Sequence, residues 1–201
     1  MMQPRTALFP GTFDPFTHGH LDLTRRAARL FDRVVIAVAE STAKGTLFEV
    51  GDRCEMIRGC VKGMRRVEVV PFSDLVVDCA RRVGAQVMIW GLRAVSDFEF
   101  EFQMALMNRR LARGIEVVFL MPSQQYTYLN STLVKEIARM GGPIKGLVPR
   151  TVEQRLRARL RLTTVAPPAQ APAAPPAATP PATGRVSARP KSSGRAKRGG
   201  R

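Results

Sequence analysis

Short apolar runs recur along the chain and alternate with segments of helical periodicity. The runs are rich in Val, Ile, Leu and Phe, which is typical of strands buried in a parallel sheet. They predict strands at residues 6–9, 34–39, 67–70, 86–90 and 115–121. Between and after them, apolar residues at helical spacing predict helices at residues 21–31, 52–61, 74–83, 97–111, 131–140 and 152–160.

This alternation predicts an α/β fold with a doubly wound, five-stranded parallel sheet, similar to a Rossmann fold. Right-handed crossovers would place helices on both faces of the sheet, and ligands would bind beyond the carboxyl ends of the strands. Local signals also mark helix starts. Asp52, with Glu55 three residues later, has the pattern of a capping box, and Asp74 and Ser96 are good candidates for N-caps.

The composition changes abruptly near Thr163, which predicts one domain at residues 1–162 and a tail at residues 163–201. Residues 166–182 are almost entirely Pro and Ala, and residues 184–201 contain seven basic residues and no acidic one. Such a segment has too little apolar surface to offset the entropy of ordering it. We therefore expect the tail to be disordered.

Charge changes this picture only slightly. The formal net charge is +16, of which the tail supplies seven charges and residues 1–164 supply +9. That balance suits an enzyme for polyanionic small molecules, but it does not separate nucleotides from nucleic acid. Cys54, Cys60 and Cys79 match neither a metal-ligand pattern nor a disulfide framework, so reduced packing residues are expected. With no apolar leader and no membrane-length apolar run, we expect a soluble cytoplasmic protein.

The loop after the first predicted strand concentrates Gly, Pro and polar residues, and residues 10–20 are PGTFDPFTHGH. It runs into a helix, whose first backbone N–H groups and partial positive charge can bind a triphosphate. His20 could donate to a phosphoryl oxygen and Thr12 to a second anion, although capping or packing is the ordinary role of such a histidine. Gly11 and Gly19 would allow close backbone approach or unusual dihedral angles.

The strings GTFDP at residues 11–15 and THGH at residues 17–20 resemble the T/HxGH signature of the nucleotidyltransferase superfamily. The longer string resembles the phosphopantetheine adenylyltransferase family in particular. That resemblance implies that His20 stabilises the transition state and that Thr12 orients the acceptor phosphate. His18 occupies the variable position of the signature, where we expect a solvated or capping residue.

Three further segments resemble the same family in order and spacing, so the resemblance covers nearly all of residues 5–160. Lys44 falls where the family has a phosphate-contacting lysine, although by itself it reads as a solvated loop residue. Residues 91–101 resemble the family string GLRAxxDFExE. There Arg93 is implied to hold ATP phosphates, which suits its planar fork of donors. Glu101 is implied to contact the nucleotide, although alone it reads as part of a charged helix face, and Asp97 is expected to cap a helix.

The third segment, residues 126–136, has the sequence YTYLNSTLVKE and resembles the family's ISSS/T-LVKE motif, which closes over the nucleotide. Asn130 replaces the usual Ser and keeps a polar side chain at a capping position. Altogether the resemblance implies catalytic roles for His20, Lys44 and Arg93, and acceptor contacts by Thr12, Lys44, Val76 and Trp90. The implied ATP contacts are Thr12, Phe13, His20, Gly91, Leu92, Arg93, Glu101, Tyr126, Thr127, Tyr128, Leu129, Asn130, Ser131 and Thr132.

Trp90 is the main departure from the family pattern, because the family has an arginine there that helps to bind the acceptor phosphate. Losing a charge-assisted contact of about 1.5–3 kcal/mol would weaken acceptor binding about tenfold to a hundredfold. Trp90 could stack on the pantetheine arm, close the crevice or simply end the strand as a packed aromatic. The substitution bears on the identity of the acceptor more than on the ATP chemistry.

The implied reaction is attack of the 4′-phosphopantetheine phosphate on the α-phosphorus of ATP, giving dephospho-coenzyme A and pyrophosphate without a covalent intermediate. Positioning and positive charge would drive it, with Mg²⁺ held mainly by ATP, since no cluster of carboxylates with metal-ligand spacing is visible. The resemblance also implies a homohexamer. Two alternatives stay open: a related adenylyl- or cytidylyltransferase with another phosphate acceptor, and a nucleic-acid-binding protein that uses the basic tail on a retired enzyme scaffold.

Overall fold

The computed structural model describes residues 5–40, 45–92 and 95–160, with only the backbone described at residues 95–97 and 100. Every described residue belongs to one compact unit. The predicted domain end at residue 162 and the predicted tail at residues 163–201 lie outside the described residues, so both stay predictions.

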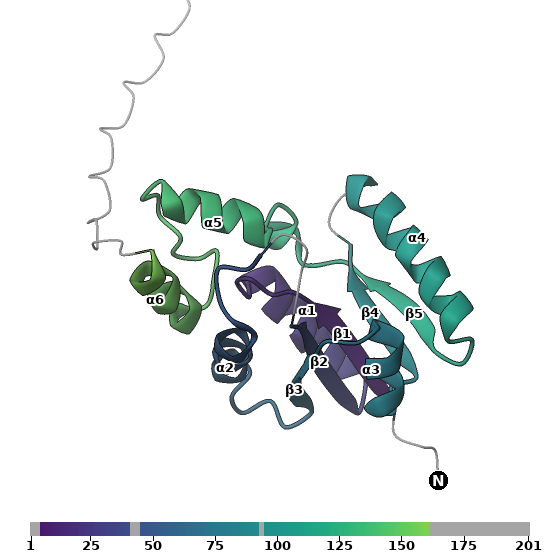
Figure 1. Cartoon of the computed structure of the whole chain (residues 1–201). Helices are drawn as coiled ribbons and strands as arrows, with labels where there is room; N and C mark the ends of the chain where they lie inside the picture. The colour runs from purple at the N-terminus through teal and green to yellow at the C-terminus, as the bar shows by residue number, and fades with distance from the viewer. Residues whose placement is uncertain (1–4, 41–44, 93–94, 161–201) are drawn as a thin grey trace, which may run out of the picture. The chain divides into compact units, whose positions relative to one another are not determined.

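The described residues follow the predicted alternation of strands and helices (Figure 1). Every predicted strand and helix is present, and no end differs from its predicted position by more than three residues. The strands are β1 (Thr6–Gly11), β2 (Arg33–Ala39), β3 (Val67–Phe72), β4 (Val87–Gly91) and β5 (Glu116–Leu120). The helices are α1 (His18–Leu30), α2 (Val50–Cys60), α3 (Val76–Arg82), α4 (Val95–Leu111), the 3₁₀ helix η1 (Gln124–Tyr126), α5 (Ser131–Arg139) and α6 (Arg150–Arg159).

The strands form one five-stranded sheet in the order β3-β2-β1-β4-β5, and every neighbouring pair is parallel. The predicted doubly wound parallel sheet is therefore confirmed. From β1 the chain builds the sheet first toward β3 and then, after crossing back, toward β5. This reversal between β1 and β4 is the topological switch point at which ligands bind in open α/β sheets.

Two apolar clusters cover the two faces of the sheet, because successive side chains of a strand point to opposite faces. Ala7 and Phe9 of β1 belong to the cluster that contains residues of α1, α2, α5 and α6. Leu8, between them, belongs to the second cluster, which contains residues of α3. In Figure 1, α1 and α3 accordingly lie on opposite sides of the strands. The helices therefore form two outer layers around the sheet.

The predicted helix caps at Asp52, Asp74 and Ser96 are wrong. Helix α2 begins at Val50, two residues earlier than expected, so Asp52 lies in its first turn. Asp52 and its predicted partner Glu55 instead bind Arg155 of α6, at 3.1 and 2.8 Å. The N-cap of α3 is Leu75, and Asp74 pairs with Arg82. Helix α4 begins at Val95, which places Ser96 and Asp97 inside the helix.

All three cysteines are free thiols, as expected. Cys54 and Cys79 are buried and Cys60 is half-buried. Burial raises the pKa of each thiol, which favours the neutral, unreactive form. Over the described part of the chain, no helix is long and apolar enough to cross a membrane.

Candidate active site

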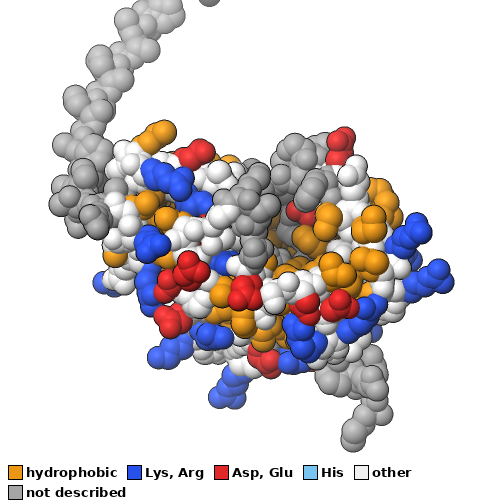
Figure 2. Space-filling model, viewed as in Figure 1, with side chains coloured by type: hydrophobic (Ala, Val, Ile, Leu, Met, Phe, Trp, Pro, Cys, Tyr) orange, Lys and Arg blue, Asp and Glu red, His pale blue; other side chains and the backbone are white. Residues whose placement is uncertain are grey.

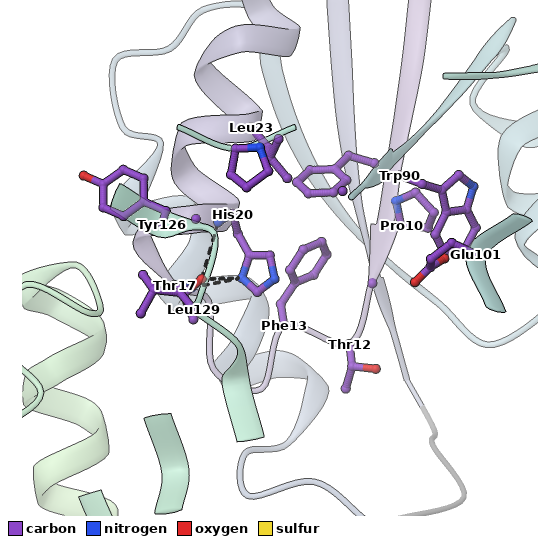
Figure 3. A pocket seen from close by; sticks show the side chains of 15 residues that line it. Pro10, Thr12, Phe13, Thr17, His20, Leu23, Trp90, Glu101, Tyr126 and Leu129 are labelled. Atoms are coloured by element: carbon purple, nitrogen blue, oxygen red, sulfur yellow. Dashed lines mark hydrogen bonds between the residues drawn. The ribbon is translucent and has the colours of Figure 1, made fainter. Parts of the chain in front are cut away.

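A pocket opens at the switch point, at the carboxyl ends of β1 and β4 (Figure 3). Its walls come from the loop after β1, the first turns of α1, the end of β4, helix α4 and the segment after β5. The lining residues are Phe9, Pro10, Gly11, Thr12, Phe13, Thr17, Gly19, His20, Leu23, Trp90, Gly91, Glu101, Pro122, Tyr126 and Leu129. The pocket thus lies where the fold predicts a ligand crevice.

The pocket gathers predicted site residues from four separate segments of the sequence. Those that line it are Thr12, Phe13, His20, Trp90, Gly91, Glu101, Tyr126 and Leu129. Other predicted residues are described but do not line it, namely Val76, Leu92, Thr127, Tyr128, Asn130, Ser131 and Thr132. Two predicted catalytic cations, Lys44 and Arg93, lie outside the described residues.

His20 is held in place by Thr17, the N-cap of α1, through a capping box. The backbone N–H of Thr17 donates to His20 Nδ1 at 3.0 Å, and the backbone N–H of His20 donates to Thr17 Oγ1 at 3.4 Å (Figure 3). Because Nδ1 accepts a hydrogen bond, we assign the proton of the neutral ring to Nε2. The half-buried imidazole therefore has a defined orientation, with Nε2 as its donor.

Aromatic rings surround this imidazole. The centroid of the Phe13 ring lies 5.1 Å from that of His20, edge-on at 89°, and the Phe16 centroid lies at 5.5 Å. Phe13 has a φ of 52°, in the left-handed region that bulky residues rarely adopt. Gly11 makes this arrangement possible, because a Cβ there would come within 2.9 Å of the Phe13 ring. The predicted close approach at Gly11 is confirmed, whereas a Cβ at Gly19 would meet its neighbours only at 3.5 Å, an ordinary contact.

The start of α1 has fewer available N–H groups than the sequence suggested. The backbone N–H of Thr17 binds His20 Nδ1, that of His20 binds Thr17 Oγ1, and that of His18 donates to Leu147 O at 3.0 Å. These groups already have partners, so an anion at this end of the helix would rely more on side-chain donors than on a row of free backbone N–H groups.

His18 is only partly exposed, and the N-cap of α1 is Thr17 instead. It is half-buried, and its ring stacks on Tyr126 with centroids 5.9 Å apart and planes at 17°. Burial, followed by the nearby charge of Arg25, lowers the pKa of His18 and favours the neutral ring. Since Tyr126 lines the pocket, His18 supports one of its walls from behind.

The start of α5 is capped as predicted, and its Ser131 side chain binds the β1–α1 loop instead of remaining available for a ligand. Asn130 is the N-cap, and its Oδ1 accepts from Leu133 N at 2.6 Å. The hydroxyl of Ser131 donates to Pro15 O at 2.8 Å. Thr132 is exposed, and Thr127 donates its hydroxyl to Gln124 O at 2.8 Å. The hydroxyls of Ser131 and Thr127 therefore hold the protein's own backbone.

Trp90 and Glu101 form the opposite wall of the pocket (Figure 3). Trp90 packs with the apolar cluster of α3, to which Val76 also belongs, on the sheet face away from α1. Its indole Nε1 is buried and has no hydrogen-bond partner among the residues the structure describes. Val76 and Trp90, both expected to bind the acceptor, thus lie on one face of the sheet, although only Trp90 reaches the pocket.

Sequence reasoning missed the buried polar residues that hold the loop after β1. Asp14 accepts backbone hydrogen bonds from Leu47 and Phe48 at 2.9 and 3.1 Å, and Lys135 of α5 binds it at 2.7 Å. Arg53 of α2 donates to Thr12 O at 2.7 Å. The helical spacing of α2 was the available signal for Arg53, because it places this residue on the face that carries Met56 and Ile57.

A second missed contact holds the segment after β5. Asp22 of α1 accepts from the backbone N–H of Ser123 at 2.8 Å and from its hydroxyl at 3.0 Å. Arg26 binds Asp22 at 3.2 Å. This contact fixes the segment that supplies Pro122 and Tyr126 to the pocket. The sequence carries no local signal for it, because its partners are about a hundred residues apart.

Comparisons with known proteins assign the family. The cytidylyltransferase-like family model matches residues 8–137. The phosphopantetheine adenylyltransferase of Methylococcus capsulatus is 56% identical over 151 residues, covering 75% of this chain and 93% of that protein. The phosphopantetheine adenylyltransferase of Moorella thermoacetica is 50% identical over 155 residues, covering 77% of this chain and 97% of that protein. The chain belongs to the phosphopantetheine adenylyltransferase family.

A solved structure supports the fold independently. A Vibrio parahaemolyticus protein assigned as a nicotinate-nucleotide adenylyltransferase superposes with a TM-score of 0.61 at 17% identity, covering 77% of this chain and 99% of that one. At this identity the likeness concerns the nucleotidyltransferase fold alone. It does not favour nicotinate mononucleotide as the acceptor.

The described pocket has an unequal distribution of charge. Among the lining residues that the structure describes, Glu101 is the only carboxylate, and none is a lysine or an arginine. Nor do the described residues contain any group of three or more His, Cys, Asp or Glu that could hold a metal ion. The described side chains of this pocket therefore offer hydrogen-bond donors and aromatic surface more than fixed charge.

Proposed function

We propose that this chain catalyses the reversible transfer of the adenylyl group of ATP to 4′-phosphopantetheine, with pyrophosphate as the second product. Membership of the phosphopantetheine adenylyltransferase family supports the reaction. The single structural observation that carries the proposal is the convergence of Thr12, His20, Glu101 and Tyr126 on one pocket at the switch point. The reaction places the chain in the synthesis of coenzyme A.

His20 is proposed to stabilise the transferring phosphoryl group. With its proton on Nε2, the ring can donate to an oxygen of the α-phosphate as charge gathers there, and the fixed ring loses little energy to reorientation. Thr12, on the same wall, is proposed to orient the acceptor phosphate. That phosphate attacks the α-phosphorus in line, the bond to pyrophosphate breaks, and the attacking oxygen remains bonded to phosphorus. A phosphate dianion is already nucleophilic, so no protein nucleophile is required.

The remaining predicted residues divide between the two substrates. Glu101, Gly91, Leu92 and the Tyr126–Thr132 segment are proposed to surround ATP, with Phe13 beneath the reacting groups. Trp90 and Val76 are proposed to contact the pantetheine arm, because both pack on the sheet face opposite α1. Lys44 and Arg93 are proposed to supply the positive charge that the described lining lacks.

Mg²⁺ is proposed to enter with ATP and to neutralise the departing pyrophosphate. The described residues do not form a protein cage for it, because they contain no cluster of three or more metal-ligating side chains. The described residues are therefore consistent with a Mg²⁺ ion that is bound through the phosphates of ATP.

An acceptor screen tests the proposed function. Purified protein with ATP and Mg²⁺ is offered 4′-phosphopantetheine, nicotinate mononucleotide or glycerol phosphate, and pyrophosphate release is measured. We expect pyrophosphate release with 4′-phosphopantetheine and with neither of the other two acceptors. In a His20→Ala variant we expect that release to be lost. Release with either other acceptor, and none with 4′-phosphopantetheine, would refute the proposal.

Ligand binding can be followed in the same protein without turnover. The chain contains one tryptophan, Trp90, and this residue lines the pocket. Its fluorescence should therefore change when 4′-phosphopantetheine is added. Removing residues 164–201 should leave turnover unchanged, and loss of turnover on truncation would overturn the view that the tail is dispensable for catalysis.

An oligomer, and a hexamer by family resemblance, is also proposed. Helix α4 exposes apolar side chains at helical spacing, with Phe98, Phe102 and Leu106 exposed by 41%, 43% and 53%. Figure 2 shows hydrophobic side chains gathered over this helix. Such a stripe on a water-soluble enzyme favours burial against another subunit. Light scattering on the purified protein would give the number of subunits, and Leu106→Glu should reduce it. Cytoplasmic localisation stays a prediction.

A further inference from the structure

Arg53 of α2 is a buried cation whose hydrogen bonds all go to backbone carbonyl groups. Its side chain is completely buried, with 0% exposure. Nε donates to Phe48 O at 3.0 Å, Nη1 donates to Ala39 O at 2.8 Å, and Nη2 donates to Glu40 O at 3.2 Å. A buried charge is costly unless it is well compensated, and here peptide dipoles provide the direct contacts.

The shortest of these hydrogen bonds reaches the wall of the proposed active site. Nη1 of Arg53 donates to Thr12 O at 2.7 Å, and Thr12 lines the pocket. The other acceptors lie at the carboxyl end of β2 and just before α2. One guanidinium group therefore joins three segments that follow one another around the carboxyl edge of the sheet. Its planar fork of donors allows this, and the single ammonium group of lysine does not.

The carbonyl held by Arg53 belongs to the peptide that precedes Phe13. Phe13 has a φ of 52°, a conformation that costs a bulky residue energy and persists only where its surroundings impose it. The orientation of the Thr12 carbonyl and the φ of Phe13 are set by the same peptide plane. By fixing that plane, Arg53 helps to hold the Phe13 ring between Gly11 and the imidazole of His20.

Asp14, on the same loop, holds the other side of this arrangement. Its carboxylate accepts from the backbone N–H of Phe48 at 3.1 Å, while Phe48 O accepts from Arg53. Burial lowers the pKa of Arg53, and the charge of Asp14 opposes that effect. Asp14 and Arg53 carry opposite charges, and both bind the backbone of Phe48. Together they anchor the loop after β1 to the segment before α2.

We propose that Arg53 is a positioning residue for adenylyl transfer, which acts through the Thr12–Phe13 peptide on the orientation of Thr12 and His20. The inference rests on the proposed function, because it assumes that these two residues face the reacting phosphates. Arg53 touches no substrate itself. Its contribution is to keep the β1–α1 loop in the conformation that the transition state requires, where a misplacement of about 1 Å can cost about a hundredfold in rate.

The test compares Arg53→Lys and Arg53→Met with a matched control, Val35→Ala. Val35 is also fully buried, but it lies on β2 and packs on the sheet face opposite α1. Circular dichroism first establishes that each variant is folded. We expect kcat to fall about tenfold to a hundredfold in Arg53→Lys and further in Arg53→Met, with a smaller change in KM for ATP. In Val35→Ala, kcat should stay within about twofold of the parent at a temperature where the protein is folded.

A second measurement needs no turnover. The chain contains two histidines, His18 and His20, so their imidazole signals can be resolved by NMR. In the unliganded Arg53→Lys variant we expect the His20 ring signals to shift, because the Phe13 ring edge moves relative to the imidazole, while His18 stays unchanged. Val35→Ala should move neither. This result is independent of which acceptor the enzyme uses.

The two measurements separate the possible failures. If the parent protein releases no pyrophosphate with 4′-phosphopantetheine, the proposed function fails, and the NMR comparison still tests the link from Arg53 to His20. If Arg53→Lys is folded and shows parental kcat and parental His20 signals, the positioning role is overturned. Failure of Arg53→Lys to fold would also overturn it, because Arg53 would then serve folding in general.

Discussion

The β1–α1 loop and the end of β4 meet at the same pocket, but they are held in different ways. On the first side, Thr12 O, Asp14 and Pro15 O each have a partner outside the loop, and Thr17 fixes His20. On the second side, Trp90 lies against an apolar cluster, and its Nε1 has no partner among the described residues. The first wall is thus fixed by directional hydrogen bonds, whereas the Trp90 side chain of the second wall is held by apolar packing.

This difference suggests a division of labour in the proposed reaction. Electrostatic stabilisation of a transition state requires donors fixed in advance, which directional hydrogen bonds to the first loop provide. Recognition of an acceptor depends on the shape and polarity of a wall, and such a wall can change without moving the reacting groups. Trp90, where the family resemblance implies an arginine, lies on the second wall.

The largest effect is expected where the first wall meets the substrate. His20→Ala should lower kcat about 10²- to 10³-fold, the usual cost of removing a fixed donor to a developing negative charge. His18→Ala is the matched control, and it should cost less than about tenfold, because it removes the stacking contact with Tyr126 and a hydrogen bond to the Val148 backbone but no group that lines the pocket. Steady-state kinetics measure kcat for the two variants and the parent. Equal losses in the two variants would break the distinction between reacting and supporting residues.

The next effect concerns the bonds that hold the first wall. Lys135→Met should lower the free energy of unfolding by about 3 kcal/mol, because it leaves the buried carboxylate of Asp14 without its cation. Arg155→Met, which removes the exposed pairs to Asp52 and Glu55, should cost about 0–1 kcal/mol.

Urea denaturation of both variants measures these two costs. Similar values for Lys135→Met and Arg155→Met would show that the first wall is no more firmly held than the surface of the domain.

The second wall is tested by restoring the family's residue. Trp90→Arg should lower KM for 4′-phosphopantetheine about tenfold to a hundredfold by adding a charge-assisted contact. KM for ATP should change little, because the nucleotide is proposed to lie against other residues. Trp90→Leu serves as the control without a cation. Weaker acceptor binding in Trp90→Arg would mean that the indole is itself adapted to the acceptor.

The smallest effect is expected at the start of α5. Asn130→Ala should lower stability by about 1 kcal/mol through loss of the bond from Asn130 Oδ1 to Leu133 N–H. Asn130→Ser, which restores the residue usual in the family, should retain most of that stability. Thermal unfolding of the three proteins compares them. An unchanged midpoint in Asn130→Ala would show that the helix end needs no side-chain cap.

Most of the fold could be predicted because its signals are local. Apolar runs and helical spacing identified every strand and α-helix, and the Gly11–His20 string identified the pocket-lining loop. Errors arose where a local signal had competing partners. Asp52 and Glu55 form a capping pattern in sequence, yet the helix starts at Val50 and both carboxylates bind Arg155. His18 looked solvated because its stacking partner, Tyr126, is far away in the sequence.

The sequence by itself therefore determined the order of the elements, the parallel sheet and the residues that gather at its carboxyl edge. Only the tertiary structure decided how those residues are held. Lys135 meets Asp14 across 121 positions, and Arg53 meets Thr12 across 41. Periodicity records which face of an element is buried, but the partner of a buried polar group depends on which segments the strand order brings together. That is why the pocket could be located from the chain, while the bonds that fix its geometry could not.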